Sequence, residues 1–301
     1  MYKKLYFSVF LFFLGLIGLN AQEKPSAEVF EEIVFNVEEF DNYVQQAVKE
    51  WEVPGLAVVV VKGDSVVFQK GYGLRELGKV GVVDAETIFA AASTTKAFTA
   101  AAIGMLVDEG KLDLDDPVIK HLPEFRIKDP YLSGIITIRD LLTHRAGLPN
   151  TDYLWINPET STEEIMQKLK YVETAYPFRS GFIYQNVMYT VAGEVVEAVN
   201  GMTWNKFIEN RILQPLKMNR TFSSMEASRQ AGNIASPHDY SGDKLITVEN
   251  SFADAIGPAG SMWTNVEDMS KWLKFLLNNC ETPGGEKLLS IVTCEELFKP
   301  Q

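Results

Sequence analysis

A run of β-branched residues followed by a turn and a second extended run constrains the fold most. Residues 56–61 read Leu-Ala-Val-Val-Val-Val, residues 62–64 read Lys-Gly-Asp, and residues 65–72 have an extended pattern again. Such runs around a short turn predict a β-hairpin. The first strand is apolar on both faces, which favours an interior place in a sheet. A lone hairpin is marginally stable, so we expect further strands elsewhere or a sheet that this chain leaves incomplete.

Helical patterns fill most of the remaining chain. Apolar residues recur at helical spacing in residues 37–51, 88–106, 188–199, 203–215 and after Thr264. Capping-box sequences at Thr137–Asp140 and Ser161–Glu164 predict two more helix starts, and residues 221–260 show no periodicity. Strands come first and do not alternate regularly with helices. We therefore predict an α+β fold, an antiparallel sheet flanked by helices with a mostly helical inserted subdomain.

The N-terminus has the features of a secretory signal. Lys3 and Lys4 precede an almost entirely apolar stretch from Leu5 to Leu19, and Ala21 is followed by polar residues. This pattern predicts a signal peptide over residues 1–21 and a polar lead-in over residues 22–36. We expect a periplasmic or secreted protein without a stable membrane span after cleavage. An uncleaved anchor is the alternative, although the apolar stretch is short for a span.

Charge and cysteine content limit the possible partners. The formal charge is −12 and becomes −14 when Lys3 and Lys4 leave with the signal, which argues against nucleic acid and anionic membranes. Cys280 and Cys294 are the only cysteines, and spacing alone leaves their pairing open. Neither has a histidine nearby, so a zinc site or a cysteine nucleophile is not expected. The sequence leaves the oligomeric state open.

Ser93 and Lys96 are the first candidate catalytic residues. In a helix, residues three apart share a face, which places the Ser93 hydroxyl one turn from the Lys96 amine. A serine needs a base within reach, and a desolvated lysine can act as one. The alanine-rich surroundings of Lys96 make such desolvation plausible. The chain repeats the spacing at Ser241 and Lys244 inside a Gly/Asp turn, and we discard that copy because nothing there fixes the geometry.

Tyr184 and Asn186 form the second candidate element. They belong to the only Tyr-x-Asn triplet in the chain. In an extended or turn backbone alternate side chains point the same way, so the phenol and the amide project together. A phenol beside an ammonium can relay a proton, and a carboxamide can orient a substrate carbonyl. A buried tyrosine beside a structural asparagine is the plainer interpretation of the triplet taken alone.

Taken together, these motifs resemble the serine β-lactamase-related family, which includes class C β-lactamases, D-Ala-D-Ala carboxypeptidases and serine esterases. The resemblance covers roughly residue 37 to the end, so residues 37–301 form the predicted domain. Its four blocks occur in the family's order, at residues 93–100, 137–149, 182–186 and 214–218.

The resemblance implies a serine acyl-enzyme mechanism without metal or cofactor. Ser93 is then the nucleophile and Lys96 the base. Tyr184 is the partner base that also protonates the leaving group, and Asn186 orients the substrate. The substrate is a β-lactam, a D-Ala-D-Ala-type peptide or a carboxylic ester, and the sequence does not decide among them.

One element of the family is missing from the sequence. The family carries Lys-Thr-Gly, Lys-Ser-Gly or His-x-Gly on a strand near its C-terminus, where it lines the site and supplies an oxyanion-hole amide. No such triplet occurs here, so we expect a domain that lacks its last strands and a 301-residue form that is weakly active or inactive. The alternative is a non-catalytic module or pseudoenzyme that binds peptidoglycan or a β-lactam.

Two further residues near these motifs are assigned as follows. His144 is interpreted as a structural residue of the turn that ends in Pro149, because a Ser-Lys-Tyr site needs no histidine. Arg179 either lowers the pKa of Tyr184 or lies on the surface, and the sequence does not choose. No Gly-x-Ser-x-Gly occurs, which argues against an α/β-hydrolase elbow.

Overall fold

The computed structural model describes residues 35–157, 159–250 and 254–301. The predicted signal over residues 1–21 and residues 22–34 of the predicted polar lead-in over residues 22–36 lie outside the described residues. The described elements belong to one unit, Asn36–Gln301. Among them, none of the helices has the length and apolar composition that crossing a membrane requires.

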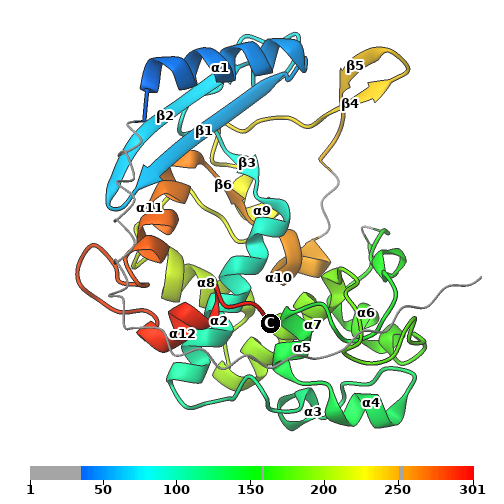
Figure 1. Cartoon of the computed structure of the whole chain (residues 1–301). Coiled ribbons are helices and arrows are strands. Elements are labelled where there is room, and N and C mark those ends of the chain that lie inside the picture. Colours follow the sequence, from blue (N-terminus) through cyan, green and yellow to red (C-terminus); the bar gives the residue numbers. More distant parts are fainter. Residues whose placement is uncertain (1–34, 158, 251–253) are drawn as a thin grey trace, which may run out of the picture. The chain divides into compact units, whose positions relative to one another are not determined.

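The described residues form a mixed structure of helices and short antiparallel strand pairs (Figure 1). The α-helices are α1 (Val37–Glu50), α2 (Thr95–Asp108), α3 (Val118–His121), α4 (Pro130–Ile135), α5 (Ile138–Leu142), α6 (Thr162–Leu169), α7 (Asn186–Asn200), α8 (Trp204–Ile208), α9 (Met225–Ser228), α10 (Gly257–Gly260), α11 (Val266–Leu277) and α12 (Ile291–Glu296). Three 3₁₀ turns, η1 (Ala92–Thr94), η2 (Asp152–Leu154) and η4 (Asp254–Ile256), and one π-helical turn, η3 (Glu209–Leu213), accompany them. The strands are β1 (Gly55–Lys62), β2 (Ser65–Gly73), β3 (Phe89–Ala90), β4 (His238–Ser241), β5 (Lys244–Thr247) and β6 (Trp263–Thr264).

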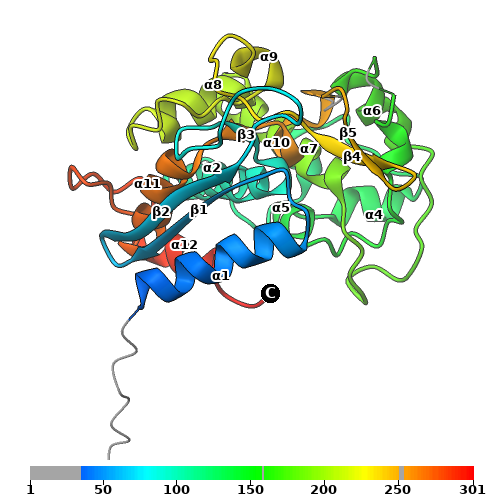
Figure 2. The ribbon, with the colours of Figure 1, turned by 90° about the horizontal axis from the view of Figure 1, so that it is seen from above.

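The predicted hairpin is present as β1 and β2, which pair antiparallel from Gly55–Gly73 to Lys62–Ser65. Helix α1 packs on β2 and α11 packs on β1, so helices cover the hairpin from two directions (Figures 1 and 2). The rings of Phe40 and Phe68 meet edge to face between α1 and β2, with centroids 5.0 Å apart. Among the described residues β1 has one paired neighbour, not the two that an interior strand has. The helices explain why β1 is nevertheless apolar on both faces.

The core is centred on α2, which packs against α7, α10 and α12. Helix α2 is rich in alanine and buries most of its side chains, so its neighbours approach it closely. Phe98 of α2 stacks on Trp272 of α11, with ring centroids 4.1 Å apart. Figure 1 shows α3 to α7 grouped on one side of α2, with α1, β1 and β2 on another. This arrangement agrees with the predicted sheet, flanking helices and inserted helical block.

Local sequence signals account for several of the observed boundaries. The capping boxes at Thr137 and Ser161 are both formed, and α5 and α6 begin directly after them. The predicted helix over residues 88–106 is wrong at its start, because the chain there first forms β3 and η1. Residues 221–260, predicted as irregular, contain the β4–β5 hairpin. Its residues are mostly exposed and polar, so no apolar periodicity reveals it.

The C-terminal part of the described chain is fixed to α2. Cys280 and Cys294 form a disulfide that joins the segment after α11 to α12. At the end of α2, Asp108 accepts hydrogen bonds from the Ser290 backbone N–H (2.6 Å) and the Thr293 hydroxyl (2.6 Å). These contacts hold α12 against the helix that carries Lys96.

Candidate active site

Ser93 and Lys96 meet at the start of α2. The Lys96 Nζ donates a hydrogen bond of 3.2 Å to the Ser93 Oγ. Ser93 lies in the 3₁₀ turn η1 and is exposed, whereas Lys96 lies in the first turn of α2 and is only 7% exposed. The predicted spacing therefore brings an accessible hydroxyl to a buried amine, although the helix proper begins after Ser93.

The backbone before Ser93 has an uncommon conformation. Ala92 has φ of +46°, in the left-handed region that residues other than glycine disfavour. The turn is held on both sides, because the Ala91 N–H donates to the Met262 carbonyl and the Met262 N–H donates to the Thr95 hydroxyl. Strained backbone persists where the surroundings determine it, and it concentrates at functional sites. The strain at Ala92 thus marks the turn that presents Ser93.

Lys96 has three hydrogen-bond acceptors from three separate segments. Besides the Ser93 hydroxyl, its Nζ donates to the Asn186 Oδ1 (2.8 Å) and to the Ala259 carbonyl (2.7 Å). An ammonium group has three donors, so all of them are used. A buried lysine is tolerated only when it is paired in this way or neutral.

Burial changes the acid–base behaviour of this lysine. Desolvation lowers the pKa of Lys96 from 10.5 to about 8, and the negative charge of Asp152 opposes part of that fall. The Nζ also lies over the rings of Tyr184 (4.6 Å to the centroid) and Tyr189 (5.4 Å). A lysine with a pKa near 8 is partly neutral at ordinary pH, so it can act as a base.

Tyr184 contacts Lys96 with the face of its ring. Its hydroxyl is buried and has no hydrogen-bond partner among residues 35–157, 159–250 and 254–301. The structure therefore brings Tyr184 next to Lys96, as predicted, but shows the ammonium over the ring face and not at the hydroxyl. A buried hydroxyl without a partner is costly and is free to bond with another group.

Asn186 is the first residue of α7, and Gln185 before it anchors the Tyr-x-Asn segment. The backbone N–H of Gln185 donates to the His144 Nδ1 (3.0 Å). Its side-chain amide donates to the carbonyls of Leu148 (2.9 Å) and Pro149 (2.5 Å). The middle residue of the triplet therefore fixes its two neighbours, a role that its sequence did not reveal.

His144 has the structural role that the sequence indicated. Burial, and to a smaller extent the charge of Lys96, lowers the pKa of His144 to about 4. A neutral ring can accept the hydrogen bond from Gln185, and it packs against Tyr184 with ring centroids 4.5 Å apart. The residue has φ of +59°, in the turn that leads to Pro149. His144 thus supports the Tyr184 segment.

Arg179 pairs with another residue of the helical block. Its guanidinium donates to both carboxylate oxygens of Asp140, over 2.8 and 2.7 Å. The Asp140 side chain is 5% exposed and also closes the capping box of α5. Of the two options for Arg179, the structure supports a role away from the Tyr184 phenol.

The second Ser-x-x-Lys copy lies in a different setting. Ser241 and Lys244 face each other as the last pair of the β4–β5 hairpin, and both are exposed. Lys244 is exposed, whereas Lys96 is buried, so this copy lacks the desolvated lysine that a base requires.

Two site residues were missed by sequence reasoning. The Ala259 carbonyl comes from α10, far along the chain, and no side-chain pattern marks a backbone acceptor. Asp152 lies in η2, and its Oδ1 accepts a hydrogen bond of 2.9 Å from the Asn186 Nδ2. The sequence after Pro149 has no apolar periodicity that would reveal this turn. The described residues contain no group of three or more His, Cys, Asp or Glu side chains that could hold a metal ion.

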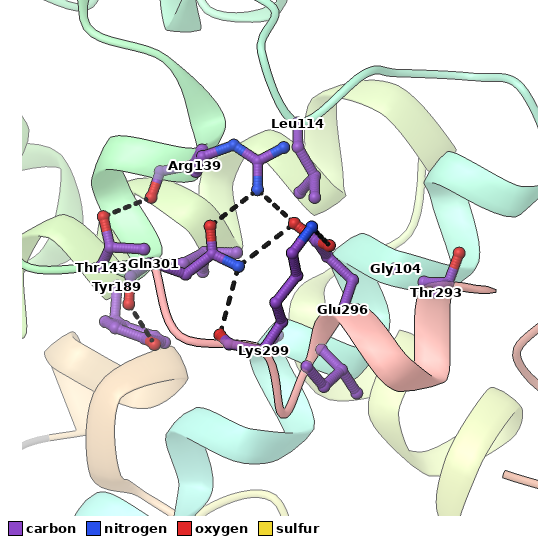
Figure 3. Close-up of a pocket in the computed structure, with 12 residues that line it drawn as sticks. Gly104, Leu114, Arg139, Thr143, Tyr189, Thr293, Glu296, Lys299 and Gln301 are labelled. Atoms are coloured by element: carbon purple, nitrogen blue, oxygen red, sulfur yellow. Dashed lines mark hydrogen bonds and ion pairs between the residues drawn. The ribbon is translucent and has the colours of Figure 1, made fainter. Parts of the chain in front are cut away.

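A separate cavity of about 140 Å³ lies between α2, α5 and α12 (Figure 3). Arg139 crosses its edge and donates to Glu296 (2.5 Å) and Gln301 (2.9 Å), and Tyr189 donates to the Leu142 carbonyl (2.8 Å). Ser93, Lys96 and Asn186 are not among the lining residues. This cavity is therefore distinct from the Ser93 site, although Tyr189 borders both.

Comparisons with known proteins identify the family of this chain. The family described as Beta-lactamase matches residues 40–291. "Unguisins hydrolase ungD'" of Aspergillus campestris is 31% identical over 265 residues, which cover 82% of this chain and 49% of that protein. "Protein flp" of Staphylococcus aureus (strain N315) is 28% identical over 244 residues, which cover 80% and 49%. The chain thus spans about half the length of the curated relatives it matches.

A solved structure supports the same assignment. The octameric penicillin-binding protein homologue from Pyrococcus abyssi is similar with a TM-score of 0.75 and 27% identity, over 87% of this chain and 59% of that one. The fold and the family match agree, and the chain belongs to the beta-lactamase family.

Proposed function

We propose that this protein is an exported serine hydrolase that forms an acyl-enzyme through Ser93 on an amide or ester substrate. The observation that carries the proposal is the 3.2 Å contact between the exposed Ser93 hydroxyl and the buried Lys96 amine. The lowered pKa of Lys96, about 8, makes this amine a usable base. Substrates of the predicted class are a β-lactam, a D-Ala-D-Ala-type peptide or a carboxylic ester.

The acylation step follows from this geometry. A neutral Lys96 takes the Ser93 hydroxyl proton while the Oγ attacks the substrate carbonyl carbon. The tetrahedral intermediate collapses, the carbonyl–heteroatom bond breaks, and the leaving amine or alkoxide takes up a proton. Tyr184 is the proposed donor of that proton, because its unpartnered hydroxyl belongs to a residue whose ring lies under Lys96, and the Lys96 ammonium then returns a proton to the phenolate. In deacylation the neutral Lys96 takes a proton from the attacking water and passes it to the Ser93 oxygen as the acyl C–O bond breaks, which releases the acid and restores Ser93.

The relatives add support at the level of the reaction class. One similar protein is named a hydrolase of unguisins, and it is 31% identical to this chain over 265 residues. This favours hydrolysis over a purely structural role. The substrate of that relative is not transferred to this chain, which covers only 49% of it.

Export is proposed from the sequence of residues 1–21. The Cys280–Cys294 disulfide supports it, because disulfides persist in oxidising compartments such as the periplasm or the cell exterior. Fractionation of cells, with the mass of the mature chain as the readout, tests this part independently. A mature form that retains residues 1–21 would contradict a cleaved signal.

Covalent labelling tests the catalytic part. The 301-residue chain is incubated with a fluorophosphonate or a penicillin, and the intact mass is measured. We expect one adduct on the wild type and none on Ser93→Ala. Ser241→Ala is the matched control, because it removes the serine of the exposed second motif, and it should be labelled like the wild type. An adduct that survives Ser93→Ala refutes the proposal, and no adduct on any form favours the non-catalytic binder or the inactive 301-residue form.

The pH dependence of labelling tests the role of Lys96. Only the neutral amine accepts a proton, and its fraction rises as the pH passes the pKa of about 8. The labelling rate should therefore rise between about pH 7 and pH 9. A rate that is flat over this range would exclude Lys96 as the base.

A further inference from the structure

Asp152 is an acidic residue held firmly at the edge of the Ser93 site. Its Oδ1 accepts hydrogen bonds from the Asn186 Nδ2 (2.9 Å) and the Trp155 indole N–H (3.0 Å). Its Oδ2 accepts from the Asn150 Nδ2 (3.0 Å). Three side-chain donors thus fix the position of one carboxylate. Nothing in the acylation step described above uses it.

The Asn186 amide connects this carboxylate to the lysine. Its nitrogen donates to Asp152 and its oxygen accepts from Lys96, over 2.9 and 2.8 Å. Turning the amide over would set its nitrogen against the ammonium donors and its oxygen against the carboxylate. Both contacts would then be lost, so the two charges together determine one orientation of the amide.

We propose that Asp152 is a positioning residue that holds the Asn186 oxygen toward Lys96 and stabilises the protonated form of that lysine. Its effect on catalysis rests on the proposed function, whereas its effect on the Lys96 proton does not. A neutral Lys96 can both donate and accept hydrogen bonds, so it no longer selects the oxygen of the Asn186 amide over the nitrogen. Asp152 can only accept, so it still holds the amide nitrogen on its own side.

The other groups around Lys96 do not supply a negative charge in the same way. His144 is neutral at neutral pH because burial lowers its pKa to about 4. Burial raises the pKa of Tyr189 well above its usual value, so its phenol keeps its proton. Tyr184 presents its ring face to the ammonium. Asp152 therefore supplies the electrostatic attraction that opposes the desolvation of Lys96.

The Asp152–Asn186–Lys96 contacts balance two requirements, a neutral Lys96 before proton transfer and a charged Lys96 after it. Burial alone favours a neutral lysine, which is the form that deprotonates Ser93. After that transfer Lys96 is charged, and the Asn186 oxygen and the Asp152 carboxylate stabilise it. We infer that Asp152 sets the pH at which the site becomes active and holds Asn186 ready for the charged state.

Asp152→Asn removes the charge and keeps the acceptor that Asn186 uses. The new amide oxygen can still accept from Asn186 and Trp155, while the negative charge and the acceptor for Asn150 are gone. We expect the pKa of Lys96 to fall by roughly one unit or more, as for the loss of an opposite charge nearby. Asp64→Asn in the exposed turn between β1 and β2 makes the same change in net charge and should leave Lys96 unchanged. Asp152→Ala removes both charge and acceptor.

The readout is the ¹³Cε signal of lysine in the labelled full-length chain, followed by NMR against pH. Lys96→Arg identifies the Lys96 signal by its loss. A lower pKa in Asp152→Asn than in the wild type and in Asp64→Asn is the expected result. An unchanged or higher pKa overturns the proposal, whatever happens to activity.

The rate of Ser93 labelling gives the second readout. Its rise with pH should shift down in Asp152→Asn by the same amount as the lysine pKa. Asp152→Ala should be labelled more slowly than Asp152→Asn at the optimum pH of each, because the Asn186 amide is then free to turn. Equal rates with no shift in pH would mean a merely structural role and would overturn the proposal. If no form is labelled while the Lys96 pKa still falls, the proposed function fails and the assignment of Asp152 to Lys96 stands.

Discussion

Replacing Gly193 with alanine tests whether the packing of α7 on α10 positions a hydrogen-bond acceptor of Lys96. Gly193 lies in α7 and faces Pro258 of α10. A Cβ at residue 193 would lie 2.1 Å from the Pro258 Cγ and 2.8 Å from its Cβ. A proline ring cannot rotate away, so α10 has to move by about 1 Å or more to restore ordinary contact.

The expected loss of stability is the difference between two effects. Overpacking a core position costs about 1–3 kcal/mol. Alanine in place of glycine within a helix gains about 1 kcal/mol. We therefore expect a net loss of up to about 2 kcal/mol, which lowers the Tm of a domain of this size by a few degrees.

The same displacement should reach the active site. The Pro258 carbonyl accepts from the Thr99 hydroxyl (2.7 Å), and the Ala259 carbonyl accepts from the Lys96 Nζ (2.7 Å). Leaving a buried donor without its acceptor costs about 1–3 kcal/mol. If half of that cost appears in the transition state, labelling of Ser93 slows by about two- to thirteenfold.

The assay combines thermal unfolding with the rate of fluorophosphonate labelling. Gly134→Ala in α4 is the matched control, because a Cβ there meets no atom within 4 Å and the glycine has ordinary helical φ. That variant should be as stable as the wild type or slightly more so, and equally reactive. If Gly193→Ala matches Gly134→Ala in both Tm and labelling rate, the packing argument and its link to Lys96 are wrong.

Two further predictions concern stability. Cys280 and Cys294 are 14 residues apart, so replacing both with alanine should cost about 3 kcal/mol and lower the Tm, as measured by thermal unfolding with and without reductant. The unfolded chain protonates His144 near pH 6.5, but the folded chain does so only near pH 4, so the contribution of His144 to stability is lost as the pH falls between these values. His144→Phe should lose less Tm than the wild type between pH 7 and pH 4, and an identical loss in both proteins would contradict a buried neutral His144.

Local patterns predicted the parts of the site that local geometry determines. Ser93 and Lys96 are three positions apart, and this spacing brings them together in a 3₁₀ turn followed by a helix as well as in a continuous helix. The capping boxes at Thr137 and Ser161 depend on hydrogen bonds over three residues and were therefore visible in the sequence.

Contacts between distant segments could not be predicted in this way. Strands β3 and β6 are two residues long, and their pairing of Phe89 with Thr264 leaves no periodic signal. The Ala259 carbonyl is a backbone group, and any residue type would provide it. Gln185 and Asp152 act through side chains, but the Leu148 carbonyl that Gln185 binds and Asp152 itself lie in turns whose shape depends on the folded core.

The hydrogen bonds of Lys96 link the candidate site to the packing of the core. Helix α2 is buried along most of its length, so a lysine in its first turn is costly unless all three of its donors are satisfied. The acceptors come from η1, α7 and α10, which meet only when the helices have packed. Lys96 therefore acquires its lowered pKa and its contact with Ser93 from the same packing of helices. It follows that substitutions in any of these segments can change the pH dependence of the site without touching Ser93.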